Sequence, residues 1–115
     1  MNREGILIDL SHASEGTFWD VIKRSKQPVF CSHSGARALC DNDRNITDEQ
    51  LRALAKNGGV IQTVAYGGFL RKDGKATIDD FVRQGKMLSC RLLSARLLQP
   101  RFAQCRTLPN TSRPA

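Results

Sequence analysis

The chain has 115 residues, of which 40% are hydrophobic and 25% are charged, a composition typical of one small globular domain. No apolar run approaches the ~20 residues that a membrane-spanning helix needs. No secretory signal opens the chain, so we expect a cytoplasmic protein without a membrane span. All 11 acidic residues and 11 of the 18 basic residues lie within residues 1–82, so the net charge of +7 belongs to residues 83–115.

The basic excess indicates a tail rather than a nucleic-acid site. From Met87 onward the residues follow neither a helical nor a strand pattern, and arginines recur at intervals of five from Arg91 to Arg106. On a helix this spacing scatters the charges around the axis, and Phe102 alone is available to stack on bases. We therefore expect residues 85–115 to form a poorly ordered basic tail without a specific nucleic-acid partner. Out-of-frame translation is a further hypothesis for this acid-free composition.

The first half of the chain predicts a strand, a helix and a second strand. Residues 5–10 form a short apolar run rich in branched side chains, which suits a strand buried on both faces. Either Ser14 or Thr17 can cap a helix over residues 18–25. Residues 28–31 then predict the second strand, because its proline stands at the first position, where it is tolerated.

A capping box marks the start of the next helix. Thr47 can accept a hydrogen bond from the amide of Gln50, whose side chain can bond back to the amide of Thr47. Leucine and alanine recur at helical spacing over residues 51–55, and Gly58 and Gly59 end the helix.

The elements that follow complete a repeated strand–helix pattern. Residues 60–66 predict a third strand, residues 67–74 a loop with a tight turn, and Thr77 the start of a helix that continues to about Gln84. Three such units predict an α/β fold, either an open doubly wound sheet or part of a (β/α)8 barrel. A complete barrel needs ~250 residues. We therefore expect a partial structure whose open strand edges favour self-association.

Both histidines of the chain follow predicted parallel strands. His12 ends the first strand and His33 the second, at the edge where α/β proteins and barrels place their active sites. If the strands are neighbours, the two imidazoles meet above the sheet, and imidazole nitrogen suits zinc. The alternative is a hydrogen-bonded pair without a metal. Two ligands are also too few, because catalytic zinc usually has three protein ligands.

Several motifs of residues 1–83 resemble the membrane (renal-type) dipeptidase family of zinc peptidases. They are residues 8–12 (Ile-Asp-Leu-Ser-His), 18–20 (Phe-Trp-Asp), 28–29 (Pro-Val), 32–34 (Ser-His-Ser), 36–37 (Ala-Arg), 44–45 (Arg-Asn) and 58–60 (Gly-Gly-Val). The resemblance implies a (β/α)8 barrel with two zinc ions, in which a metal-bound water hydrolyses dipeptides. It implies that His12 and His33 are ligands of one zinc ion and that Arg44 holds the carboxylate of the substrate.

Other parts of the family pattern have no counterpart in these residues. They are the His-x-Asp metal motif of the first barrel strand, the glutamate that bridges the two ions, a substrate-contacting histidine and a substrate-site aspartate. We therefore expect residues 1–84 to be a partial barrel segment with at most a partial zinc site, no assigned catalytic residue and little or no activity alone. A chain that carries the missing half could complement it. The alternative is a non-enzymatic fragment or a basic-tailed binding protein.

The remaining candidates receive structural interpretations. Strand alternation turns Asp9 away from His12, so we interpret it as structural, with support of a metal ligand as the alternative. Tyr66 ends the predicted third strand, and we interpret it as rim packing, with a place facing the site as the alternative. The cysteines at 31, 40, 90 and 105 fit no zinc-ribbon spacing, and we expect reduced thiols.

Overall fold

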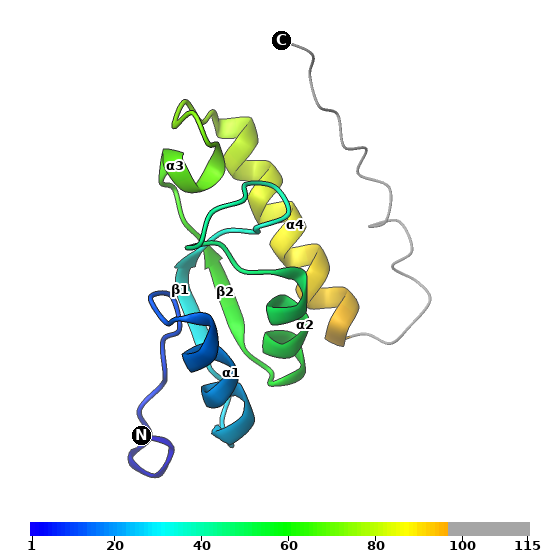
Figure 1. Cartoon of the computed structure of the whole chain (residues 1–115). Coiled ribbons are helices and arrows are strands. Elements are labelled where there is room, and N and C mark those ends of the chain that lie inside the picture. The colour runs from blue at the N-terminus through cyan, green and yellow to red at the C-terminus, as the bar shows by residue number, and fades with distance from the viewer. Residues whose placement is uncertain (97–115) are drawn as a thin grey trace.

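The computed structural model describes residues 1–96 as a mixed α/β fold with a small parallel sheet (Figure 1). The elements in chain order are η1 (Asn2–Glu4), α1 (Glu15–Arg24), β1 (Phe30–Ser34), α2 (Asp48–Lys56), β2 (Val60–Thr63), α3 (Gly67–Leu70) and α4 (Ile78–Arg96). Strands β1 and β2 are parallel, with Phe30 opposite Val60 and Cys31 opposite Ile61. The predictions for residues 97–115 lie outside the described part of the chain.

The strand predicted over residues 5–10 is wrong except at one position. Asp9 and Phe30 form an isolated parallel bridge, in which the Leu10 amide donates to the Phe30 carbonyl at 2.8 Å. Ile6 and Leu7 are 51% and 65% exposed. An apolar run of this kind is a strand when it is covered on both faces. Within residues 1–96, it meets a neighbour at the edge of β1 only, so the pairing does not extend.

Side-chain caps start the first two α-helices. Ser14 accepts a hydrogen bond from the Thr17 amide, so α1 begins at Glu15, three residues earlier than the apolar pattern predicts. The capping box predicted at Thr47 is confirmed: the Gln50 amide donates to the Thr47 hydroxyl at 3.2 Å, and the Gln50 side chain accepts from the Thr47 amide at 3.0 Å. Gly58, with φ of +80°, follows the end of α2.

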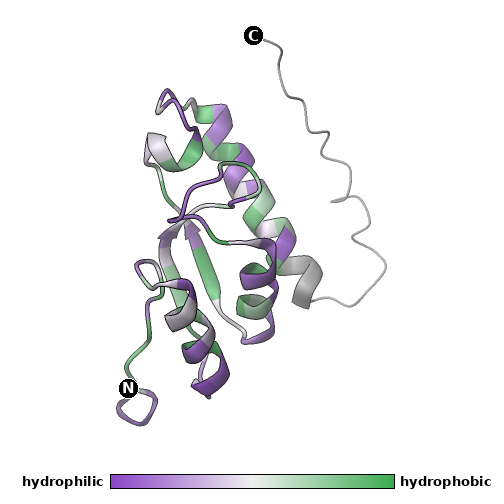
Figure 2. Cartoon of the chain, viewed as in Figure 1, coloured by the Kyte–Doolittle hydropathy of each residue, from purple (hydrophilic) through white to green (hydrophobic). Residues whose placement is uncertain are grey.

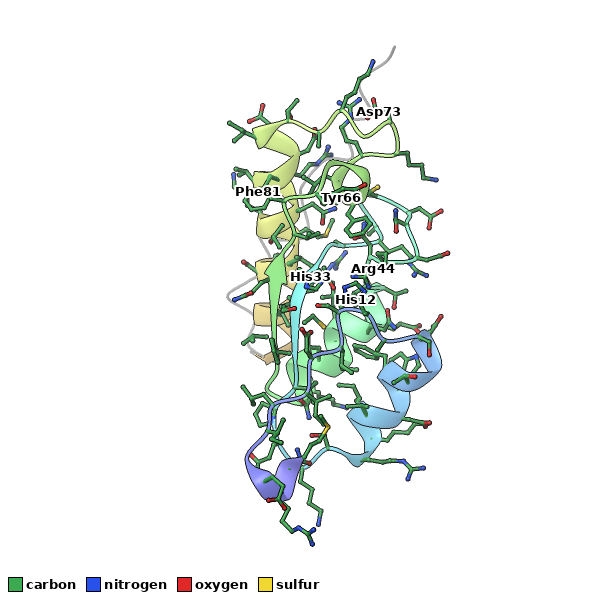
Figure 3. All side chains as sticks on the ribbon, turned by 90° about the vertical axis from the view of Figure 1, so that its left-hand side faces the viewer. His12, His33, Arg44, Tyr66, Asp73 and Phe81 are labelled. Atoms are coloured by element: carbon green, nitrogen blue, oxygen red, sulfur yellow. The ribbon has the colours of Figure 1, made fainter. Side chains whose placement is uncertain are left out.

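One continuous core lies between the helices and one face of the sheet. Figure 3 views the strands from the front, with α2 and α4 behind them. Burial therefore alternates along β2, where Ile61 packs against the core while Val60 is 52% exposed. Figure 2 shows that apolar residues are frequent in the strands and occur in the helices packed beside them. The buried residues of this core are Leu10, Phe18, Val29, Cys31, Ala36, Ile46, Leu51, Leu54 and Leu88.

The last helix extends well beyond its predicted end. Residues 67–70 form the short helix α3 instead of the predicted loop, and α4 continues past Gln84 to Arg96. The expectation of irregular structure from Met87 is therefore wrong up to residue 96. Tertiary packing supplies the reason: Leu88 is 2% exposed in the core, and the buried Gln84 side chain accepts from the Ala36 amide at 2.7 Å.

The cysteines separate into two states. Cys31 and Cys40 are free and buried, and desolvation raises the pKa of the Cys31 thiol to about 12. Cys90 is disulfide-bonded, so the expectation of reduced thiols is wrong at that residue.

Candidate active site

The structure brings the two histidines together at the carboxyl end of β1. His12 follows the segment that bridges to Phe30, and His33 lies near the end of β1. Their Nε2 atoms are 2.8 Å apart, and the ring centroids are separated by 4.8 Å (Figure 3). The convergence that adjacent parallel strands predict for these imidazoles is therefore present in the fold.

A carboxylate and a hydroxyl support the far side of the His33 ring. Asp9 Oδ2 lies 2.5 Å from the Ser32 hydroxyl, which lies 2.7 Å from His33 Nδ1. Asp9 Oδ1 accepts from the backbone amides of Ser11 and Ser32. Desolvation acts to raise the pKa of Asp9, but the hydrogen bonds from Ser32 and Ser11 outweigh it and lower the pKa to about 2. The purely structural interpretation of Asp9 misses this contact.

The signal for that contact was present in the cross-strand geometry. Asp9 stands opposite Phe30, and Ser32 is the next residue of β1 on the same face, so it is the diagonal neighbour of Asp9. Ser11 adds a further tie, because its hydroxyl accepts from the His33 amide at 2.9 Å. Side chains thus hold the two segments together beyond the backbone bridge, where the histidines meet.

Arg44 reaches the same end of the sheet from the loop before α2. Its Nη1 donates to the carbonyl of Ser11, the residue before His12, and its guanidinium lies 5.6 Å from the Phe69 ring centroid. Its Nη2 is buried and has no hydrogen-bond partner within residues 1–96. A guanidinium N–H without a partner suits a carboxylate oxygen, which it binds with a charge-assisted hydrogen bond.

The unpaired Nη2 atom belongs to a small polar cavity. Ser34 Oγ and Asn45 Oδ1 are also buried without partners in the described chain, and both residues line the same cavity of about 40 Å³ as Arg44. Three unsatisfied polar atoms on residues that line one cavity are a costly arrangement in a dry core. A water molecule could satisfy them, because it can accept from Arg44 Nη2 and donate to Asn45 Oδ1, whereas a carboxylate oxygen could accept from Nη2 only.

Tyr66 lies on the rim of this region. Its ring packs edge-on against Phe69 at 4.9 Å between centroids, and the residue is 60% exposed. Phe69 in turn lies against Arg44. These contacts agree with the rim-packing interpretation of Tyr66. The Phe69 ring lies between Tyr66 and the Arg44 guanidinium.

The two histidines offer imidazole nitrogens, a kind of donor that suits zinc. Zinc–nitrogen distances near 2.0–2.1 Å in a tetrahedral site place two ligand nitrogens about 3.3 Å apart, so the rings need to separate by about 0.5 Å from their present contact. The donor atoms therefore fit zinc in kind, and their present separation is shorter than a shared zinc ion needs. No group of three or more His, Cys, Asp or Glu side chains that could hold a metal occurs within residues 1–96. Within this part of the chain, His12 and His33 are therefore a pair of donor nitrogens without a third donor beside them.

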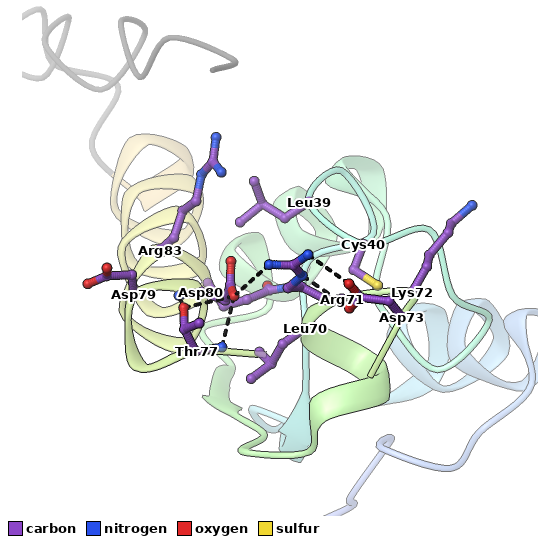
Figure 4. Close-up of a pocket in the computed structure, with 11 residues that line it drawn as sticks. Leu39, Cys40, Leu70, Arg71, Lys72, Asp73, Thr77, Asp79, Asp80 and Arg83 are labelled. Carbon is purple, nitrogen blue, oxygen red and sulfur yellow. Dashed lines mark hydrogen bonds and ion pairs between the residues drawn. The ribbon is translucent and has the colours of Figure 1, made fainter. Parts of the chain in front are cut away.

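A larger cavity of about 690 Å³ lies beside α3 and the start of α4 (Figure 4). Arg71 crosses it, paired with Asp73 at 2.7 Å and with Asp80 at 3.9 Å. These pairs offset the charge of Arg71, the residue that crosses the cavity. Neither histidine lines this cavity, and it contributes nothing to the site around His12 and His33.

Residues 1–86 match the family described as membrane dipeptidase, peptidase family M19. An uncharacterized dipeptidase of Schizosaccharomyces pombe is 48% identical over 82 residues, which are 70% of this chain and 20% of that protein. Dipeptidase 3 of Homo sapiens is 45% identical over 71 residues, which are 62% of this chain and 14% of that protein. The chain therefore spans a small part of the length of these curated relatives.

Solved structures show the same relationship. A metallopeptidase from Rhodobacter sphaeroides, crystallised with a phosphinate mimic of the dipeptide L-Ala-D-Ala, superposes with a TM-score of 0.75 at 35% identity. The superposition covers 79% of this chain and 27% of that one. The arrangement of strands and helices described above is thus shared with a larger metallopeptidase.

The expected cytoplasmic location is wrong, because the matching family is described as membrane dipeptidase. The absence of a leader in this stretch is no guide to location, since the curated relatives are several times longer than the part that matches. None of the helices within residues 1–96 is long and apolar enough to cross a membrane.

Proposed function

This chain belongs to the membrane dipeptidase family, and on that premise we propose that it carries part of the active site of a zinc-dependent dipeptidase. His12 and His33 are the proposed ligands of one zinc ion, and Arg44 is the proposed binding group for the substrate's carboxylate. The observation that supports the proposal best is the 2.8 Å approach of the two Nε2 atoms. Arg44 donates a hydrogen bond to the carbonyl of Ser11, the residue before His12.

The proposed roles follow from the chemistry of each side chain. When bound, zinc would lower the pKa of a coordinated water and so supply the nucleophile for hydrolysis of the peptide bond. His12 and His33 bring two ring nitrogens together from adjacent segments and would hold the ion between them. The planar guanidinium of Arg44 matches the geometry of a carboxylate, so it would orient the dipeptide by its carboxyl end.

The proposed architecture is a partial barrel. Residues 1–84 would form three βα units of a (β/α)8 barrel, and residues 85–115 the basic tail, although α4 crosses residue 85 without interruption. The change of composition after residue 82 and the end of the family match at residue 86 support this division. The exposed Leu7 and Val60 would then face other barrel strands.

We further propose that the chain alone has little or no peptidase activity. Two histidines do not complete a catalytic zinc site, and the described residues gather no third ligand around them. A polypeptide with the remaining ligands would have to complement the chain, and the open edge of the sheet is where it would pair. Self-association through the same edge would compete with complementation.

A non-enzymatic fragment, or a basic-tailed binding protein, is the second candidate. A separation of 2.8 Å is an ordinary hydrogen-bond distance, so each imidazole already satisfies the other without a metal. On this alternative the histidine pair closes the end of the sheet, and zinc content per purified chain would be near zero.

Zinc titration of the purified 115-residue chain separates the two candidates. We expect one weak site, which disappears in the double variant His12→Ala/His33→Ala. The matched control is Cys40→Ser, which removes a buried thiol away from the histidines and should leave zinc binding unchanged. No binding in the unaltered chain, or full binding in the double variant, would contradict the metal site. Zinc-dependent hydrolysis of Gly-D-Ala by the chain alone would contradict the proposed inactivity.

A further inference from the structure

A carboxylate, a hydroxyl and two imidazoles form one chain of contacts beside β1. Asp9 Oδ2 contacts the Ser32 hydroxyl at 2.5 Å, the hydroxyl contacts His33 Nδ1 at 2.7 Å, and His33 Nε2 contacts His12 Nε2 at 2.8 Å. We propose that Asp9 and Ser32 are positioning residues that hold His33 as the Nδ1–H tautomer, with its Nε2 lone pair directed at His12. The link to metal binding rests on the proposed function, whereas the tautomer itself does not.

Counting protons along this chain assigns the tautomer. The Ser32 hydroxyl carries one proton, and an ionised carboxylate only accepts. The short Asp9–Ser32 contact therefore takes the hydroxyl proton, because two oxygens 2.5 Å apart with no proton between them would repel. Ser32 Oγ then offers only lone pairs to His33 Nδ1. His33 Nδ1 must consequently be the donor, and in a neutral imidazole this leaves Nε2 as the acceptor.

Backbone hydrogen bonds fix the Asp9 carboxylate, which sets the direction of the hydrogen bonds along this chain of contacts. Asp9 Oδ1 accepts from the Ser11 amide at 3.0 Å and from the Ser32 amide at 3.1 Å, one from each segment. These bonds leave Oδ2 facing the Ser32 hydroxyl. The Ser11 hydroxyl also accepts from the His33 amide, which fixes the backbone that carries the ring.

The orientation matters for the proposed ligand role. A metal ion binds the unprotonated ring nitrogen, and the hydrogen bond made by the other nitrogen decides which one that is. His33 Nε2 faces the point where both rings converge, so a proton at Nδ1 leaves the correct nitrogen available. In the absence of metal, His12 Nε2 then donates the proton of the contact between the rings.

The tautomer is measurable directly in the full chain. We would label the histidines with ¹⁵N and record long-range ¹H–¹⁵N correlations at a pH where both rings are neutral. The expected spectrum shows His33 protonated at Nδ1 and bare at Nε2. Asp9→Asn reverses the relay, because an amide nitrogen donates to Ser32 and Ser32 then donates to Nδ1, so His33 should become the Nε2–H tautomer. The Zn²⁺ affinity of His33 should fall roughly 10–100-fold in the same variant.

Further variants separate positioning from a general effect on the fold. Ser32→Ala breaks the relay and should give a mixture of tautomers, whereas Ser32→Thr keeps the hydroxyl and should restore Nδ1–H. Asp41→Asn is the matched control, because Asp41 is an exposed acid paired with Lys72 at 3.5 Å and should leave His33 unchanged. If Asp9→Asn does not fold, the unaltered chain and the Ser32 pair still decide the outcome.

Two results would overturn the assignment: an Nε2–H or evenly mixed His33 in the unaltered chain, or a folded Asp9→Asn chain whose tautomer is unchanged. Failure of the proposed function looks different. In that case His33 would be protonated at Nδ1 as assigned, but its resonances would not respond to Zn²⁺.

Discussion

Replacing Leu88 by alanine tests whether α4 belongs to the folded unit beyond Gln84. Leu88 is 2% exposed and joins the main core cluster, in a region whose composition alone predicts irregular structure. Truncation of a buried leucine costs about 2–5 kcal/mol, through lost burial and the cavity that remains. We expect a loss near the middle of this range, because the site lies at the contact of α4 with the other layers. For a domain of this size, about 3 kcal/mol lowers Tm by roughly 12–24 °C.

Urea unfolding followed by circular dichroism measures the effect, with Trp19 fluorescence as a second probe of the same core. Leu7→Ala is the matched control, because it removes the same atoms from a side chain that is 65% exposed, and it should change stability by less than about 0.5 kcal/mol. If Leu88→Ala behaves like Leu7→Ala, the end of α4 does not pack on the core and the continuation of the helix is of no structural consequence.

Three further predictions concern single hydrogen-bonding groups. Thr47→Ala should destabilise the chain by about 1 kcal/mol, measured by urea unfolding, because it removes the cap of α2. Gln84→Leu should cost about 1–3 kcal/mol in the same assay, because the buried Ala36 amide loses its acceptor. The pKa of Asp9 is lowered from 3.8 to about 2, so its stabilising contribution is present above the unfolded value and is lost as the pH falls through the folded one. Unfolding midpoints measured across this acid range should therefore fall less steeply in Asp9→Asn than in the unaltered chain, and equal slopes would contradict the hydrogen bonds assigned to Asp9.

The sequence predicted helix ends well where the hydrogen bonds that define them join residues close in the chain. The capping box at Thr47 and the glycines after α2 act within a few residues, so their geometry follows from the sequence. The end of α4 depends instead on a distant partner. Leu88 packs into a core built largely from residues 10–54, and no periodicity within residues 85–96 reports that contact.

The prediction of a strand over residues 5–10 was wrong because the neighbours that such a strand needs are missing from the described residues. Its apolar side chains are those of a strand covered on both faces, and within the described residues only the β1 edge pairs with it. Ile6 and Leu7 remain exposed as a result. The pattern thus describes the environment of a larger fold, of which this chain spans a part.

Alternation of side chains along a strand predicted one feature of the site and missed another. It placed His12 and His33 at one edge, and the rings meet there, because the parallel bridge between Asp9 and Phe30 aligns the two segments. It turned Asp9 away from His12 and so missed that the carboxylate reaches His33 through Ser32 on the neighbouring strand. Alternation within one strand is a local rule, whereas this contact is a diagonal pair between two segments.

The histidine pair is therefore held by neighbours close in the fold rather than by a closed barrel. Asp9 and Ser11 tie the first segment to β1 with side-chain hydrogen bonds, and those bonds lie entirely within residues 9–33. The orientation of the two imidazoles can therefore be tested separately from peptidase activity. On the proposed function, the two imidazoles would be oriented for a metal ion before the remaining ligands are supplied, so zinc affinity and the His33 tautomer are sharper tests of this site than dipeptidase activity.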